Sequence, residues 1–357
     1  MDFQSCLIQQ INRHPSMQPR DILKLCYQGA YGAEHLLENL GHARACLEKE
    51  YAIVDAADSE LFEVISPQVC RINLAAWKYR NLPIEWLFRM FAASASIHPS
   101  GSALFESYLR TAEELTAQGM IGFHFSDWQS YLSNYRASGK SSVHHSEHYR
   151  QSEHPSYRII SCRYLCLLPL LEKIASSMDG KDICVIAIDG PAASGKSTLA
   201  KHLNTILDAD IVQMDDFFLP PSLRTEERFR TPGGNIHHER FLEEVVAHLA
   251  EPEGFSYRVF DCGQMALNGE KFIDSKPFRI VEGSYSCHPV FGRYADATAF
   301  LQVDPDEQMR RIFDRNGEKM AELFKNRWIP LEEAYFNHFS IAAKADFILN
   351  PSFPSET

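Results

Sequence analysis

The stretch GPAASGKS, residues 190–197, followed by Thr198, fits the phosphate-binding pattern G-x-x-x-x-G-K-[S/T] at every fixed position. The apolar run 183–188 before it is typical of a buried parallel strand, and the segment 199–207 after it is typical of a helix. A strand that leads through a glycine-rich turn into a helix directs backbone N–H groups and the positive end of the helix dipole to one place. The sequence therefore predicts a phosphate-binding loop.

Two side chains of this loop carry specific chemistry. Lys196 can bridge the β- and γ-phosphates of a nucleoside triphosphate, and the Ser197 hydroxyl can be a ligand of Mg²⁺. The alternative is a chance glycine turn between a strand and a helix, which the complete pattern and both flanks disfavour. The residues expected to surround the phosphates are Gly190, Ala192, Ala193, Ser194, Gly195, Lys196, Ser197 and Thr198.

The composition argues against several classes of protein. A chain of 357 residues is long enough for two domains. Its formal net charge of -12 argues against a general nucleic-acid-binding surface. No apolar run is long enough to cross a bilayer, and the first residues lack a secretory core. The nine cysteines include no C-x-x-C pair. These features predict a reduced, cytoplasmic protein without nucleic-acid or membrane partners, and they are compatible with a homo-oligomer.

The spacing of apolar residues changes near the middle of the sequence. Before the change, apolar residues recur at helical spacing, which predicts a mostly α-helical domain over residues 1–176. The polar stretch 177–182 is expected to be a linker, and residues 183–357 a second domain. The main helical segments expected in the first domain are Asp21–Leu37, Ile84–Ala95, Ser102–Gln118 and Tyr157–Ile174.

In the second domain, short apolar strands alternate with helical segments. This alternation predicts parallel strands with right-handed crossovers, and hence a P-loop three-layer α/β sandwich with a parallel sheet. In such sheets, ligands bind at the carboxyl ends of the strands. After the first strand, the expected strands are residues 211–214, 257–260, 278–281, 298–303 and 347–349, and the expected helices are residues 238–250, 305–315 and 331–344.

Acidic residues follow two of these strands. Asp215 and Asp216 come directly after the second strand, and Glu282 follows the strand 278–281. A carboxylate at Asp215 could accept the proton of an acceptor hydroxyl or bind Mg²⁺, and Glu282 could hold Mg²⁺ directly or through water. The alternative is that these acids open a surface loop or a turn, which their position at strand ends disfavours.

The sequence DDFF at 215–218, taken with the phosphate-binding loop and Val281–Gly283, resembles the uridine kinase-like family of P-loop kinases. That family also includes phosphoribulokinase and bacterial pantothenate kinase, and the resemblance covers residues 183–349, about half the chain. It implies that Asp215 is the general base and that an arginine-bearing lid follows the fifth strand. In this sequence the lid corresponds to residues 310–327, where Arg315 and Arg327 are expected to close over the triphosphate.

The sequence departs from this family where the phosphoryl acceptor binds. Uridine-cytidine kinases have an aspartate that holds the ribose hydroxyls, but the loop TPGGNIHH at 231–238 has no acid. They also have a Tyr-Asp element and a later histidine that read the pyrimidine, whereas FDCGQM at 260–265 keeps only the aspartate. A site that selects its substrate by hydrogen bonds needs those groups, so we expect another acceptor. The candidate acceptor contacts are Asp216, Asn235, His237, His238, Asp261, Tyr285 and His288.

Taken together, these features predict an ATP- and Mg²⁺-dependent kinase that transfers the γ-phosphoryl group to a hydroxyl of a small metabolite. The alternative is a regulatory switch, in which nucleotide occupancy of the second domain controls the first. An acid on the acceptor side and an arginine lid favour the enzyme, because a switch needs neither. Histidines are frequent in the first domain, among them His35, His98 and His145, but their spacing matches no zinc signature.

Overall fold

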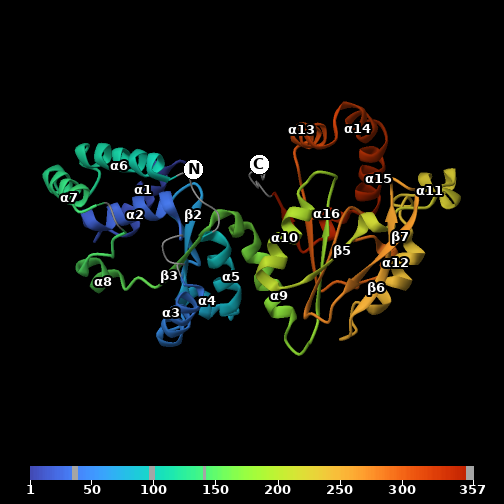
Figure 1. The fold of residues 1–357 in the computed structure, drawn as a ribbon, viewed down its shortest axis with the longest axis horizontal. Coiled ribbons are helices and arrows are strands. Elements are labelled where there is room, and N and C mark those ends of the chain that lie inside the picture. Colours follow the sequence, from blue (N-terminus) through green and yellow to red (C-terminus); the bar gives the residue numbers. More distant parts are fainter. Residues whose placement is uncertain (34–38, 96–100, 140–141, 351–357) are drawn as a thin grey trace. The chain divides into compact units, whose positions relative to one another are not determined.

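The computed structural model describes residues 1–33, 39–95, 101–139 and 142–350. The chain forms two compact units, Met1–Leu165 and Cys166–Thr357 (Figure 1). Helix α9 (Leu168–Ser177) belongs to the second unit, because it packs against two strands of that unit's sheet. The boundary therefore precedes α9 and does not coincide with the linker predicted at residues 177–182.

The first unit is mostly helical, and it also contains a three-stranded antiparallel sheet in the order β1-β2-β3. The prediction of one helix over Tyr157–Ile174 is wrong at its start, because Tyr157–Ser161 is β3 and pairs with β2. Over so short an apolar run, helical and strand spacing are not distinguishable. The elements are α1 (Phe3–Arg13), α2 (Pro19–Tyr31), α3 (Leu40–Ile53), β1 (Phe62–Val64), β2 (Val69–Asn73), α4 (Leu74–Tyr79), α5 (Ile84–Ala95), α6 (Gly101–Ala117), α7 (Phe125–Ala137), α8 (Glu147–Glu153) and β3.

A buried polar network joins the helices and the sheet of this unit. Asp21 is fully buried and lies 2.9 Å from Nδ1 of His145, whose Nε2 lies 2.7 Å from the Tyr157 hydroxyl. Burial lowers the pKa of His145 to about 4, so the ring is neutral near pH 7 and can donate to Asp21 while accepting from Tyr157. Beside them, the buried Arg71 donates to Gln28 at 2.7 Å. These contacts give His145 a structural role.

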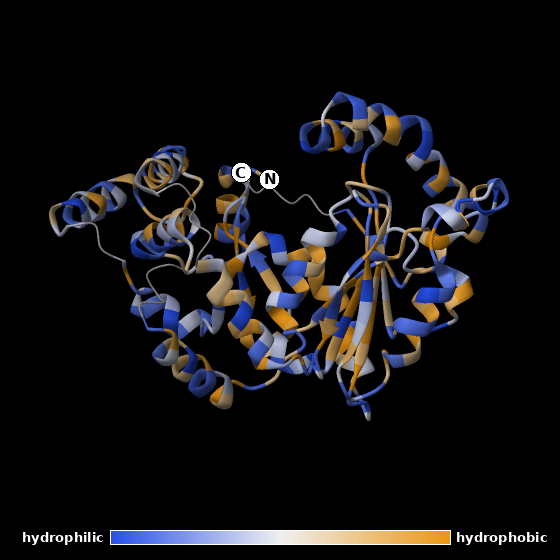
Figure 2. Cartoon of the chain, turned by 45° about the vertical axis from the view of Figure 1, so that its right-hand side comes forward, coloured by the Kyte–Doolittle hydropathy of each residue, from blue (hydrophilic) through white to orange (hydrophobic). Residues whose placement is uncertain are grey.

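The second unit is built on a five-stranded parallel sheet in the order β10-β9-β4-β8-β5. Its central strand β4 is buried along its whole length, as expected for a strand covered by helices on both faces. Figure 2 shows the strands of this sheet as largely hydrophobic. The predicted α/β fold is confirmed. The strands are β4 (Cys184–Asp189), β5 (Asp210–Gln213), β8 (Phe278–Glu282), β9 (Ala297–Leu301) and β10 (Phe347–Leu349).

The strand order places a ligand-binding position between β4 and β8. The connection that leaves β4 runs to β5 on one side, whereas the connection that leaves β8 runs to β9 on the other side. Where neighbouring connections leave in opposite directions, a crevice forms outside the carboxyl ends of the strands. In this unit that crevice lies beside the loop 190–195 and the start of helix α10 (Lys196–Leu207).

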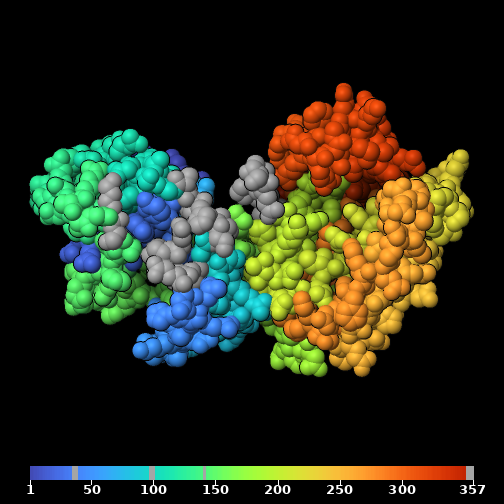
Figure 3. Space-filling view, in the orientation of Figure 1, coloured from blue at the N-terminus to red at the C-terminus, as the bar shows by residue number. Residues whose placement is uncertain are grey.

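One predicted strand does not belong to this sheet. Tyr257–Phe260 lies in β6 (Phe255–Asp261), which forms a separate antiparallel hairpin with β7 (Ala266–Ile273). Its partner β7 is mostly exposed and polar, so the hydrophobic pattern did not reveal it. The remaining helices are α11 (Glu226–Arg230), α12 (His238–Glu244), α13 (Pro305–Asn316), α14 (Glu318–Leu323), the π-helix η7 (Phe324–Trp328), α15 (Ile329–Phe339) and α16 (Ile341–Lys344). Figure 3 shows α13 to α15, in red, as one mass at an edge of the second unit.

Two features are absent from the described residues. None of their helices combines the length and the hydrophobicity that crossing a bilayer requires. No group of three or more His, Cys, Asp or Glu side chains among them could hold a metal ion. Two of the histidines named from the sequence, His35 and His98, lie outside the described residues.

Candidate functional site

The register of the sheet brings the three predicted strand ends together. Glu282, the last residue of β8, pairs with Ile188 of β4 on one side and with Gln213 of β5 on the other. The phosphate-binding loop begins two residues after Ile188, and Asp215 lies two residues after Gln213. Because the strands are parallel, the loop, Glu282 and Asp215 lie at the same edge of the sheet.

The phosphate-binding loop has the backbone that its glycines predict. Gly190 has a φ of 143°, and a Cβ atom there would lie 2.6 Å from the Leu301 carbonyl oxygen, so only glycine fits. Gly195 caps α10 with a φ of 100°. The Lys196 ammonium group donates to the carbonyl oxygens of Gly190 and Pro191, each at 2.8 Å. The lysine is thus folded back over the loop, beside the N-terminus of α10 where an anion would bind.

Ser197 and Glu282 form an oxygen pair beside this loop. The Ser197 hydroxyl donates to Oε1 of Glu282 at 2.9 Å. Burial raises the pKa of Glu282, and the charge of Lys196 and the bond from Ser197 oppose that shift. Hydroxyl and carboxylate oxygens are the ligands that Mg²⁺ prefers, and Mg²⁺ commonly takes only one or two protein ligands and completes its shell with water and phosphate oxygens. The residues present therefore fit a magnesium ion.

Asp215 opens directly into the crevice. Its carboxylate accepts no hydrogen bond from any residue in the described part of the chain, and it is exposed to the cavity. Enclosure by the surrounding protein nevertheless raises its pKa, because the charged form is disfavoured there, while Lys196 acts in the opposite direction. An unpaired carboxylate with a raised pKa at the edge of a crevice can accept a proton from a bound hydroxyl.

These groups line one cavity of about 820 Å³ in the second unit. Most of the predicted nucleotide, metal and catalytic residues lie on its wall, and some of the predicted acceptor residues do. The predicted residues on the wall are Ala192, Ala193, Gly195, Lys196, Ser197, Thr198, Asp215, Asn235, Glu282, Tyr285 and Arg315. The predicted residues that are not on the wall are Gly190, Ser194, Asp216, His237, His238, Asp261, His288 and Arg327.

Asp216 and Asp261 hold the β6–β7 hairpin. The buried Asp216 carboxylate accepts from the Tyr257 hydroxyl at 2.9 Å and from Lys271 at 2.7 Å. Asp261 accepts from the backbone N–H of Gly263 at 2.7 Å, which closes the hairpin turn. Both carboxylates therefore make contacts within the fold, and neither lies on the cavity wall.

The three predicted histidines also make structural contacts. The ring of His238 lies 2.9 Å from the Gly233 carbonyl oxygen, and burial lowers its pKa to about 4. His288 stacks in parallel on Tyr335, with 5.4 Å between the ring centroids. His237 precedes α12, and its backbone N–H donates to the Phe217 carbonyl oxygen at 2.7 Å. These contacts stabilise the loop before α12, and none of the three histidines lies on the cavity wall.

The arginines of the predicted lid divide into two groups. Arg315 lies on the cavity wall together with Arg310 and Arg311, which the sequence pattern included in the lid but did not single out. Arg311 also donates to the Ala193 carbonyl oxygen at 3.2 Å, and so contacts the phosphate-binding loop directly. Arg327 lies instead over the rings of Phe229 and Trp328, at 5.0 and 5.2 Å from their centroids. It is a packing residue in this structure.

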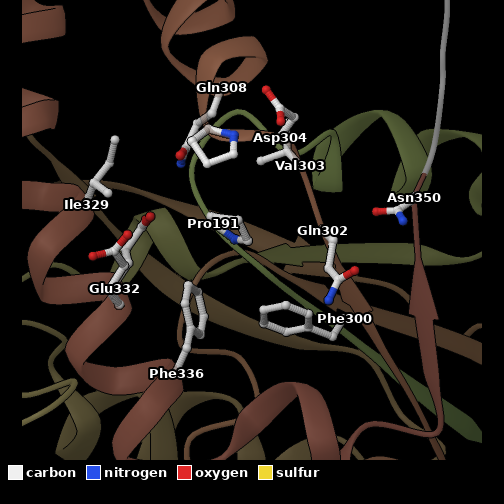
Figure 4. A pocket seen from close by; sticks show the side chains of 12 residues that line it. Pro191, Phe300, Gln302, Val303, Asp304, Gln308, Ile329, Glu332, Phe336 and Asn350 are labelled. Carbon is white, nitrogen blue, oxygen red and sulfur yellow. The ribbon is translucent and has the colours of Figure 1, made fainter.

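Two residues outside the sequence motifs brace the loop at Ala192. Gln308 of α13 donates to the Ala192 carbonyl oxygen at 2.9 Å, and Glu332 of α15 accepts from the Ala192 N–H at 2.8 Å. Figure 4 shows Gln308 and Glu332 around a second cavity, of about 430 Å³, that also adjoins Pro191. Helix α13, which carries the first arginines of the lid, and helix α15, which follows the lid, are thus both bonded to the phosphate-binding loop. Neither residue belongs to a recognisable motif, so the sequence did not reveal them.

Asp189, the last residue of β4, fixes the geometry of this edge. Its fully buried carboxylate accepts from the backbone N–H groups of Gly190, Tyr285 and Cys287 at 2.7 to 3.0 Å and from the Tyr335 hydroxyl at 2.8 Å. Tyr285 has a φ of 78°, which is unusual for a bulky residue and is held here by its bond to Asp189.

We expect Asp189→Ala to destabilise the second unit by at least about 3 kcal/mol, because four donors, three of them buried, lose their acceptor and each unpaired buried group costs about 1–3 kcal/mol. Asp189→Asn keeps one acceptor oxygen and should cost less. Hydrogen exchange of the backbone amides of β4 and β8, measured at increasing urea concentrations, reports the stability of this unit separately from that of the first unit. Unchanged exchange protection in Asp189→Ala would show that the network does not stabilise the site.

Among known proteins, only solved structures resemble this chain, and they do so over about half of its length. No family model matches the chain, and no curated protein matches it. The solved structures that align with its C-terminal half include a possible uridine kinase from Bacillus stearothermophilus, at 17% identity and a TM-score of 0.38 over 51% of this chain and 99% of the other. A candidate fructose transport system kinase from a Silicibacter species has 20% identity and a TM-score of 0.43 over 52% and 98%. Shikimate kinase from Bacteroides thetaiotaomicron has 18% identity and a TM-score of 0.29 over 48% and 89%.

All three neighbours are P-loop kinases, as the resemblance seen in the sequence implied. Likeness at this level carries no argument about activity or substrate. The strand order, the loop backbone and the lysine and carboxylates at one sheet edge define the C-terminal unit as a P-loop α/β fold.

Proposed function

We propose that this protein is an ATP- and Mg²⁺-dependent kinase that phosphorylates a hydroxyl of a small metabolite. The observation that carries the proposal is the meeting of three groups in one cavity: the Lys196 loop, the Ser197–Glu282 oxygen pair and the unpaired Asp215 carboxylate. Phosphoryl transfer needs little more than positioning and charge stabilisation, and these groups supply both. A nucleotide switch would not need an unpaired acid facing the space beside the phosphates.

Each residue has a defined task in this reaction. The N–H groups at the start of α10 and the Lys196 ammonium group bind the β- and γ-phosphates. Arg310, Arg311 and Arg315 lie on the same wall and can stabilise the charge that develops on the transferred group. Asp215 takes the proton of the acceptor hydroxyl as its oxygen bonds to the γ-phosphorus. The bond from that phosphorus to the β-phosphate oxygen breaks, and ADP leaves.

Magnesium, when bound, would neutralise phosphate charge next to Ser197 and Glu282. We expect Glu282→Gln to raise the Mg²⁺ concentration needed for half-maximal activity by about 10–100-fold, the range found when a group that supports a metal is lost. Glu322→Gln, an exposed acid on α14, is the matched control and should leave the Mg²⁺ requirement unchanged. An unchanged requirement in Glu282→Gln would exclude Glu282 from the metal site.

The direct test of the proposal is ADP formation from ATP and Mg²⁺ with a panel of hydroxyl compounds, followed by detection of the phosphorylated product. Acceptor-dependent ADP formation supports the kinase. Tight ATP binding with slow hydrolysis that no acceptor accelerates would instead favour the regulatory switch. Failure to bind ATP would contradict both.

A further inference from the structure

Part of the cavity wall belongs neither to the phosphate-binding loop nor to α13. Its apolar side chains include Phe218, Met265 and Trp328, together with Leu323 and Phe324. Two polar residues, Arg224 and Asn235, lie among them. The phosphate chemistry described above uses neither of these two residues. Their contacts indicate what this side of the cavity is built to hold.

Arg224 presents a guanidinium group without a counter-charge. Its Nε donates to the Leu219 carbonyl oxygen at 2.8 Å, which orients the group, and its two terminal nitrogens make no bond within the described chain. No carboxylate of the described residues forms an ion pair with it. The other arginines of its segment differ, because Arg228 is paired with Glu239 and Arg230 with Glu226. A planar guanidinium with free terminal nitrogens fits a carboxylate or a phosphate group.

Asn235 presents an amide without hydrogen-bond partners. The residue is only 4% exposed, and neither its Oδ1 nor its Nδ2 has a partner in the described part of the chain. Tyr285 lies close enough for Asn235 to influence its pKa, but the two groups do not meet hydrogen-bonding geometry. Buried amides are normally paired, so an unpaired one on a cavity wall points to a ligand that pairs with it.

The loop that carries Asn235 is held rigidly. A Cβ atom at Gly234 would lie 2.1 Å from the Arg228 carbonyl oxygen, so the two backbones touch. The Arg228 guanidinium donates to the carbonyl oxygens of Gly234 and Ile236 at 3.1 and 2.8 Å. The backbone on both sides of Asn235 is therefore held in place without a ligand.

Arg224, Asp215 and Cys262 all lie on the wall of the same cavity. Burial raises the pKa of the Cys262 thiol, the charge of Asp215 raises it further, and the charge of Arg224 lowers it. The proposed base and the unpaired guanidinium group therefore border one continuous cavity that a single small molecule can occupy.

We propose that the phosphoryl acceptor is a small hydroxylated anion, a hydroxycarboxylate or a sugar phosphate. Its anionic group binds the terminal nitrogens of Arg224, its reacting hydroxyl lies at Asp215, and Asn235 pairs with a polar group between them. This assignment rests on the proposed kinase function and defines its substrate class. A neutral nucleoside would leave Arg224 unpaired.

The test is calorimetric binding to the full-length protein saturated with Mg²⁺ and a non-hydrolysable ATP analogue. The probes are matched pairs: glycerate with glycerol, and ribose 5-phosphate with ribose, with uridine as a further neutral probe. We expect an anionic probe to bind at least about 10-fold more tightly than its neutral partner, as a charge-assisted hydrogen bond provides. The pair that shows this difference identifies a carboxylate or a phosphate as the anionic group. Equal affinities within both pairs, or tighter binding of uridine, would overturn the proposal.

Arg224→Gln should weaken binding of the preferred anion about 10–100-fold and leave binding of the ATP analogue unchanged. Arg230→Gln is the matched control, because Arg230 lies in the same segment but is exposed and paired with Glu226 at 3.0 Å. An Arg224→Gln protein that binds the anion normally would overturn the proposal. Loss of ATP-analogue binding by the wild-type protein would instead contradict the kinase function itself, so the two failures are distinguishable.

Asn235→Leu separates a ligand-binding role from a structural one. The substitution removes two unpaired buried polar atoms, so we expect an unchanged or higher melting temperature together with weaker anion binding. A lower melting temperature with normal anion binding would show that Asn235 serves the fold and would remove it from the site.

Discussion

Lys196→Ala is expected to lower kcat by about 10³-fold or more and to weaken ATP binding, while the protein stays folded. Among the described residues, Lys196 is the only lysine on the cavity wall, and it lies at the start of α10, where the phosphates would bind. Its loss leaves the Gly190 and Pro191 carbonyl oxygens beside a cavity that water can enter, so little stability should be lost.

The same substitution should also change the acid groups around the lysine. The charge of Lys196 lowers the pKa values of Asp215, Glu282 and Glu332, in each case against the effect of burial. Without it those pKa values rise, and the fraction of ionised Asp215 at a given pH falls. Any residual activity of Lys196→Ala should therefore decline at a higher pH than that of the wild type when the solution is acidified.

Steady-state kinetics, ATP-analogue calorimetry and a pH profile test this prediction. Lys201→Ala, one turn further along α10 and exposed, is the matched control and should behave as the wild type. Near-normal turnover by a folded Lys196→Ala protein would refute the kinase proposal.

The sequence predicted the α/β fold and the centre of the candidate site because both depend on local patterns. The loop 190–197 is contiguous, and its function follows from backbone geometry that glycines dictate. Asp215 and Glu282 were found because they follow apolar strands, and parallel strands place their ends at one edge. For the loop, Asp215 and Glu282, the local sequence is therefore enough to predict where they lie in the fold.

The acceptor side could not be predicted in the same way, because its residues are selected by long-range packing. His238 and His288 look like ligand-binding residues in sequence, yet both rings pack against the turn at Gly233, beside the carbonyl oxygens of Gly233 and Pro232. Asp216 differs from Asp215 by one position, and in the structure it bonds to the β6–β7 hairpin, which is far along the chain. Arg224 has no sequence signal, since only the absence of a partner distinguishes it from Arg228 and Arg230.

Asp215→Asn is expected to lower kcat by about 10²–10⁴-fold and to leave the affinity for ATP nearly unchanged, because the amide keeps the shape of the side chain but cannot accept the proton. The pH dependence supplies a second test. A base must be ionised to act, so wild-type kcat should fall as the pH drops through the pKa of Asp215, which burial raises above its ordinary value. That acid limb should be absent from the residual activity of Asp215→Asn.

Asp216→Asn is the matched comparison, since it makes the same chemical change one residue away. Its carboxylate accepts from Tyr257 and Lys271 inside the unit, so the substitution should lower the melting temperature and change kcat little. A large loss of kcat in Asp216→Asn with a mild effect in Asp215→Asn would mean that the neighbouring acid is the base. If both variants kept normal kcat, neither Asp215 nor Asp216 would act as the base. The unpaired carboxylate of Asp215 would then no longer favour an enzyme over a regulatory switch.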